Sequence, residues 1–205
     1  EPGGGQIALA VRERMLTPQQ AVLVSPDYAP NARAAGLLGL VTDAGVTWRR
    51  SVAQGYDRLL MQLRQGRIRY LVLAGDKAVL PADADEPLRK ALEGCELSVE
   101  LTPSAGGLGQ VQFPSRTVNE KSGVLLNGRG RLQQLQALLD GPSGSYPEWV
   151  LLQRLGEACG VKLLSAAAAD EQSLFREMAG SVPQLGCVSL AEISGSGVLL
   201  EELLH

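Results

Sequence analysis

A nearly continuous apolar run, Ile68 to Ala74, constrains most strongly how this chain folds. An apolar run without alternation is typical of a strand that is buried in a parallel sheet. Helical patterns lie on both sides of it, from Ser51 to Gly66 and from Asp85 to Gly94, and a second strand pattern follows from Leu97 to Leu101. Strands that alternate with helices are typical of right-handed βαβ units. The sequence therefore predicts an α/β fold with a mostly parallel, Rossmann-like sheet and flanking helices.

The residues before this run continue the same alternation. A compact apolar strand is expected from Ala21 to Ser25, a helix from Asn31 to Gly45 and a short strand from Val46 to Arg49. Asn31 and Ser51 have side chains that accept hydrogen bonds from the first free N–H groups of a helix, so each is predicted to cap one. The chain starts without methionine at Glu1 and a glycine linker follows, so a piece of a longer protein is expected.

After Thr102 the pattern becomes irregular. Short strands are predicted at Val111–Phe113, Val124–Leu126 and Arg131–Leu135. One helix is predicted from Pro147 to a stop at Gly160, and another is predicted to begin after Asp170. We expect three parts: a linker and short helix over 1–18, an α/β domain over 19–118, and a C-terminal extension over 119–205 that packs on it, irregular β followed by helices.

Composition excludes several classes of protein. The net charge of −3 and the lack of a basic run argue against binding to nucleic acid. The single histidine, His205, is the last residue, which removes Ser-His and Cys-His nucleophilic pairs, and we expect no catalytic residue. Cys95, Cys159 and Cys187 lack metal-ligand spacing and are predicted to be small buried hydrophobes. No apolar run approaches the roughly 20 residues that a spanning helix needs, so no direct membrane insertion is expected.

Two glycine-containing loops are candidates for binding a cofactor. Gly75 and Asp76 follow the strongest strand, at the carboxyl edge where open α/β sheets bind ligands. The loop from Gly106 to Gly109, with Gly107 at its centre, could offer backbone N–H groups to a phosphate. A plain turn and a plain glycine loop are the alternatives for these two segments.

The segment from Pro114 to Trp149 contains a motif with a fixed spacing. Its members, expected to be structural, are Glu120, Gly123, Asn127, Gly130, Arg131 and Trp149. Gly123 and Gly130 suit positions that need positive φ or close packing, Asn127 suits a turn, Glu120 and Arg131 could pair across the loop, and Trp149 is an apolar anchor.

This motif, read as E-K-x-G-x-x-x-N-x-x-G-R-x-Q and followed by Pro147-Glu148-Trp149, resembles the molybdopterin oxidoreductase superfamily. Within it, the chain is most similar to the large iron-sulfur subunit of the NADH-quinone oxidoreductase of respiratory complex I. The tail from Val182 to Leu200 contributes to that likeness, and Thr102-x-Ser104-Ala105 resembles the superfamily's T-x-T-A step.

The resemblance implies an oxidoreductase and electron-transport setting. It implies a cofactor-less structural domain in the peripheral arm of complex I, with the other subunits as partners, at the inner face of a bacterial cell membrane. Alone the chain would catalyse nothing and hold no metal; iron-sulfur clusters are expected upstream of Glu1. The chain departs from the superfamily's pattern at Asp76, Gln110 and Arg129, which points to loss of dinucleotide binding.

Two alternatives stay open. The chain could be part of a molybdopterin-dependent oxidoreductase, with Gly75, Asp76 and the Gly107 loop against the pterin guanine dinucleotide. It could also be a free-standing small-molecule binding module that uses the same sheet.

Overall fold

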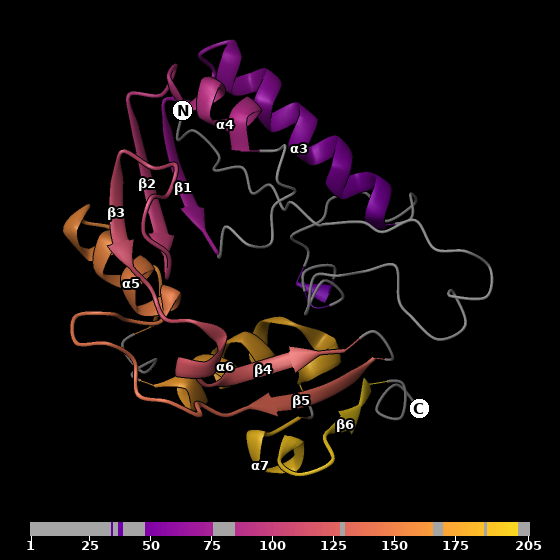
Figure 1. Ribbon diagram of the computed structural model, residues 1–205. Coiled ribbons are helices and arrows are strands. Elements are labelled where there is room, and N and C mark those ends of the chain that lie inside the picture. Colours follow the sequence, from indigo (N-terminus) through magenta and orange to yellow (C-terminus); the bar gives the residue numbers. More distant parts are fainter. Residues whose placement is uncertain are drawn as a thin grey trace, which may run out of the picture.

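The first sheet is parallel and is accompanied by helices, as predicted. The structure is a computed structural model, and it describes residues 34, 37–38, 48–75, 85–127, 130–165, 170–186 and 188–200. Its first part contains, in chain order, α3 (Trp48–Arg64), β1 (Tyr70–Ala74), α4 (Asp85–Leu92), β2 (Leu97–Thr102) and β3 (Val111–Pro114). The strands lie in the order β1-β2-β3 and both pairs are parallel (Figure 1). The α/β fold class is thus confirmed.

Helix α3 begins earlier than the sequence pattern predicted. Trp48 and Arg49, expected in a short strand, are helical, and Ser51 lies inside the helix instead of capping it. Neither glycine nor proline lies between Trp48 and Ser51, so the helix extends past Ser51 towards its N-terminus. At the other end Gly66 has a φ of 64°, the left-handed conformation that closes many helices.

Helices α3 and α4 cover one face of this sheet. Their apolar side chains form one buried cluster, Leu60, Leu63, Leu88, Ala91, Leu92 and Cys95, and Leu71 and Leu73 of β1 pack against it. The other face of β1 is open among the described residues, because Tyr70 is 62 % exposed and Val72 is 44 % exposed. The expectation of a strand buried on both faces was therefore wrong for β1 in this part of the chain.

Helix α5 (Glu148–Ala158) packs on the opposite face of β2. Val99 and Leu101 of β2 and Leu151 of the helix form a small buried cluster. The helix ends at Ala158, and Gly160, two residues beyond, has a φ of 72°, which confirms the predicted stop at this glycine. Cys159, just before that glycine, is exposed, so its predicted burial was wrong.

The second sheet is antiparallel and is built from β4 (Gly123–Leu126), β5 (Arg131–Leu135) and β6 (Val198–Leu199). Figure 1 shows it below the parallel sheet, with α6 (Glu171–Ser181) behind it and α7 (Leu190–Ile193) beneath. Short 3₁₀ turns lie at Val118–Glu120 and Pro183–Leu185. A buried cluster joins these elements: Leu126, Leu132, Phe175, Ala179, Leu185, Val188, Ile193 and Leu200. The irregular β and helical C-terminal part is confirmed.

Two side chains from the helix predicted at Asn31–Gly45 contact the buried cluster of the antiparallel sheet. Ala34 and Leu37 pack against it, and the N–H of Leu38 donates to the carbonyl of Ala34 at 2.8 Å. The strand predicted at Ala21–Ser25 and the rest of the helix lie outside the described residues. The predicted part boundaries at residues 18 and 118 stay predictions.

Candidate functional site

The carboxyl edge of the parallel sheet begins at Gly75. This residue follows β1, has a φ of 140°, and donates its N–H to the carbonyl of Leu101 at 3.2 Å. A side chain there would be strained by the backbone conformation, although an added Cβ would meet no neighbouring atom. Asp76, its partner in the candidate site, lies outside the described residues. Cofactor binding at Gly75 thus stays a prediction.

The connection between β2 and β3 is unusually short. Parallel neighbours normally need a dozen or more residues and a helix to cross over, but here residues 103–110 alone do it. The loop backbone lies directly on β2: a Cβ added to Gly109 would be 2.7 Å from the Cβ of Glu100, and one added to Gly107 would overlap the Glu100 carboxylate. These two glycines are needed for close backbone approach.

A polar face of β2 holds this loop. Ser98, Glu100 and Thr102 alternate along the strand and all three are buried. The N–H of Gly109 donates to Oε2 of Glu100 at 2.7 Å, and the N–H of Gln110 donates to Oγ of Ser98 at 3.1 Å. Side chains of β2 thus accept hydrogen bonds from the N–H groups of the loop. In a crossover helix, the backbone would form these bonds internally.

Glu100 was not among the residues singled out from the sequence. Its signal was the alternation of Ser98, Glu100 and Thr102 within an otherwise apolar strand, which indicates a polar partner on one face. A buried carboxylate of this kind needs hydrogen-bond donors, and the N–H of Gly109 is one.

Backbone amides of the glycine loop donate hydrogen bonds to side chains of the same chain. The N–H of Gly107 donates to Oε1 of Gln112 at 3.3 Å, and that of Gly109 is taken by Glu100. Ser104, in the resembling T-x-S-A step, donates its N–H to Oγ1 of Thr102 at 3.2 Å, a local turn. The two amides at 107 and 109 therefore already have acceptors within the chain.

The Asn127 turn behaves as predicted. Oδ1 of Asn127 accepts from the N–H of Arg131 at 3.0 Å, and its Nδ2 donates to Oε1 of Gln133 at 3.0 Å. Gly130 closes the turn with a φ of 81°. These bonds fix the connection between β4 and β5, whereas Gly128 and Arg129 lie outside the described residues.

Two other expectations about the motif were wrong. Glu120 accepts from the N–H of Thr117 at 2.9 Å, and Arg131 donates to the carbonyl of Gly197 at 3.1 Å, so these two side chains do not form the expected pair. Gly123 lacks a positive φ, and an added Cβ would meet no atom within 4 Å. Arg131 instead ties β5 to the residues that lead into β6.

An ion pair joins two parts of the motif that are far apart in sequence. Nζ of Lys121 lies 2.7 Å from Oε1 and 2.9 Å from Oε2 of Glu148, the first residue of α5. Both side chains are about three-quarters buried, at 26 % and 22 % exposure. Next to it, Nε1 of Trp149 is buried without a hydrogen-bond partner in the described part of the chain. The pair connects the start of the second sheet to the helix that packs on the first.

Glu148→Gln is expected to lower the free energy of unfolding by about 1–2 kcal/mol, because it leaves a largely buried ammonium with a weaker acceptor. Urea unfolding of the single variants and of Glu148→Gln with Lys121→Met gives the coupling energy of the pair. Glu86→Gln is the matched control, since the Glu86–Lys90 pair is exposed at 3.4 Å and its loss should change almost nothing. Equal effects of the two Glu→Gln changes would contradict a structural role for Lys121.

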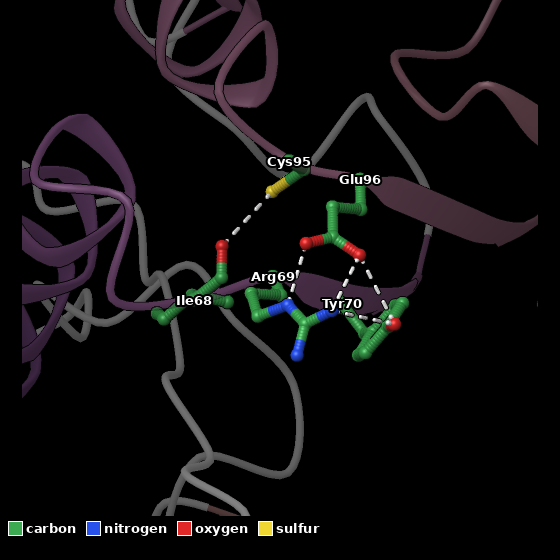
Figure 2. Close-up of polar contacts among 5 residues, drawn as sticks. All are labelled: Ile68, Arg69, Tyr70, Cys95 and Glu96. Carbon is green, nitrogen blue, oxygen red and sulfur yellow. Dashed lines mark hydrogen bonds and ion pairs between the residues drawn. The ribbon is translucent and has the colours of Figure 1, made fainter.

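A second polar cluster lies at the opposite, amino-terminal end of the sheet. Figure 2 shows Arg69 and Tyr70 gathered around the carboxylate of Glu96, with Nη2 of Arg69 2.9 Å and the hydroxyl of Tyr70 3.1 Å from Oε2. Nearby, Sγ of Cys95 donates to the carbonyl of Ile68 at 3.7 Å, and burial raises the pKa of its thiol. This cluster links the starts of β1 and β2.

The hydrogen bond from Arg69 lowers the pKa of Glu96 below its usual 4.5. A carboxylate with a lowered folded-state pKa stabilises the fold above its unfolded pKa, and that stabilisation is lost as pH falls through the folded value. We therefore expect the wild-type chain to lose more stability below about pH 4.5 than Glu96→Gln does, measured by thermal unfolding between pH 7 and pH 3. Glu93→Gln, an exposed neighbour, is the control and should follow the wild type. Parallel curves for wild type and Glu96→Gln would contradict the ion pair.

No metal centre is formed by the residues that the structure describes, since they contain no group of three His, Cys, Asp or Glu that could hold an ion. Nor does any helix among them have both the length and the apolar character required to cross a bilayer.

The fold defines an α/β domain with a parallel sheet. Comparison with known proteins identifies relatives of this chain. No protein-family model matches the chain. It is 29 % identical over 138 residues to the F420-dependent formate dehydrogenase 2 subunit alpha of Methanococcus maripaludis, covering 64 % of this chain and 20 % of that protein. It is 29 % identical over 188 residues to the NADPH-Fe(3+) oxidoreductase subunit alpha of Geobacter sulfurreducens, covering 86 % of this chain and 22 % of that protein.

A shorter match is to the nitrate reductase of Klebsiella oxytoca, 24 % identical over 106 residues, or 50 % of this chain and 12 % of that protein. All three relatives are redox enzymes or their subunits. The chain spans about a fifth or less of the length of these curated relatives. It is thus a distant relative of oxidoreductase subunits.

Proposed function

We propose that the chain is a structural part of the large subunit of a multi-subunit oxidoreductase of the molybdopterin superfamily. The observation that carries the proposal is the match to the NADPH-Fe(3+) oxidoreductase subunit alpha, which extends over 86 % of this chain. The superfamily motif adds to it, because Lys121 and Glu148, from its two halves, form an ion pair that holds the two sheets' elements together.

The proposed role of this chain is structural, as a folded scaffold within the large subunit. Its described residues supply an antiparallel sheet and a parallel sheet with α3 and α4 on one face and α5 on the other. In the glycine loop that follows β2, the amides at 107 and 109 already donate hydrogen bonds within the chain. Electron transfer then belongs to the whole subunit and its partners. In this first candidate, the molybdenum and pterin of the parent enzyme are held mainly by residues outside the described ranges.

The second candidate is the large iron-sulfur subunit of NADH-quinone oxidoreductase, in the peripheral arm at the inner face of a bacterial membrane. The observation that favours it is the glycine loop 103–110, in which the N–H of Gly109 already donates to Glu100. A domain that has lost its cofactor needs no free N–H groups to bind a phosphate. The resemblance of the tail, Val182 to Leu200, points the same way.

Metal and cofactor analysis of the full-length protein, purified from its own host, separates the two candidates. The first candidate predicts about one molybdenum per subunit together with a pterin guanine dinucleotide. Iron-sulfur clusters without molybdenum, with NADH dehydrogenase subunits in the same complex, would favour the second. A protein with neither metal and no partner would remove both and leave the free-standing binding module.

A further inference from the structure

We propose that the carboxylate of Glu100 is a built-in anion that occupies the glycine loop 103–110 and excludes phosphate from it. This inference concerns the loop itself and goes beyond the proposed function, since it holds whichever oxidoreductase contains the chain. It assigns to Glu100 a role in determining what the loop that follows β2 binds.

The carboxylate of Glu100 is buried against the glycine loop. Glu100 lies in the middle of the central described strand, is only 6 % exposed, and points towards the loop that crosses from β2 to β3. Its Oε2 accepts the N–H of Gly109 at 2.7 Å, a short charge-assisted bond. An isolated buried carboxylate is costly, so this bond stabilises both the charge and the loop.

The loop backbone fits closely around the side chain of Glu100. A Cβ at Gly107 would overlap the carboxylate, and a Cβ at Gly109 would lie 2.7 Å from Cβ and 2.9 Å from the backbone nitrogen of Glu100. Only glycine at both positions lets the backbone approach so closely. The glycines that would suit a phosphate loop thus serve an internal carboxylate.

Two neighbouring amides of the loop also donate hydrogen bonds within the chain. The N–H of Gly107 donates to Gln112, and the N–H of Gln110 donates to Ser98. A phosphate would have to displace Glu100 and bring a second negative charge next to a buried one, which is unfavourable in a poorly solvated environment. A cofactor phosphate, if the parent enzyme binds one, is therefore held away from these amides.

The test is residue-resolved hydrogen–deuterium exchange of the full-length protein, with and without inorganic pyrophosphate. In the wild type, the amide of Gly109 should exchange slowly, and pyrophosphate should not change its rate. In Glu100→Ala the same amide should exchange about tenfold faster or more, because its charge-assisted acceptor is gone. Pyrophosphate should then restore part of the protection of the Gly109 amide, since it can bind where the Glu100 carboxylate was.

Glu100→Gln keeps the shape and an acceptor but removes the charge, so its Gly109 amide should exchange about threefold faster and gain less from pyrophosphate. It serves as the second variant if Glu100→Ala does not fold. The wild-type measurement, with and without pyrophosphate, requires neither variant. Glu93→Gln, on the exposed surface, should match the wild type. Pyrophosphate protection of Gly109 in the wild type, or unchanged exchange in both Glu100 variants, would overturn the proposal. So would a failure of pyrophosphate to protect folded Glu100→Ala.

Discussion

Leu101→Ala is expected to lower the free energy of unfolding by about 2–5 kcal/mol, the usual cost of removing a fully buried leucine side chain. Leu101 is 0 % exposed and lies on the face of β2 that receives α5, where it shares a buried cluster with Val99 and Leu151. The loss creates a cavity between the sheet and the helix. Urea unfolding followed by circular dichroism measures it.

Leu138→Ala is the control for this prediction, because Leu138 is 77 % exposed and its truncation removes little buried surface. We expect a change within about 0.5 kcal/mol for that variant. Comparable losses at both positions would mean that α5 does not pack on β2 in the way described, and the parallel sheet would lose its cover on that face.

Gly197→Ala should be the most damaging glycine substitution in the second sheet, with a loss of about 3 kcal/mol or more. Gly197 has a φ of 76°, and an added Cβ would overlap the carbonyl oxygen of Leu132 and lie 3.1 Å from the Cγ of Gln133. The residue leads directly into β6, which pairs with β5 through Leu132 and Val198. The backbone must therefore move and the short strand must separate.

Gly195→Ala separates the two causes of this loss. Gly195 has a similar φ of 81°, but an added Cβ would meet nothing within 4 Å. It should cost only the left-handed backbone strain, about 1–2 kcal/mol. Unfolding in urea, with both variants compared to the wild type, gives the difference. If the two variants were equally stable, the close contact between β5 and Gly197 would be wrong.

The fold was largely predictable from the sequence because its signals are local. The cap at Asp170, the strand from Leu97 and the stops at Gly66 and Gly160 each depend on residues a few positions apart. The start of α3 was misplaced for the same reason: Ser51 is a good local cap, but neither glycine nor proline lies between Trp48 and Ser51 to break the helix. Propensity gives the kind of element more reliably than its boundaries.

The candidate site was less predictable because its contacts are not local. Asn127 was correctly assigned to a turn, since its partners lie within six residues. The predicted pair of Glu120 with Arg131 was wrong, because a hydrogen bond to the N–H of Thr117, three residues away, competes with any longer-range pair. Glu100 was missed because its partner, Gly109, is brought to it only by the tight return of the chain onto β2.

Purification of the affinity-tagged full-length protein from its own host tests the proposal that this chain is part of a multi-subunit oxidoreductase. We expect a stoichiometric complex with other redox subunits. Its iron-sulfur clusters should be visible by electron paramagnetic resonance, and it should reduce a dye with an electron donor such as formate, NADPH or NADH. A lone polypeptide that carries no redox centre and reduces no dye would contradict it.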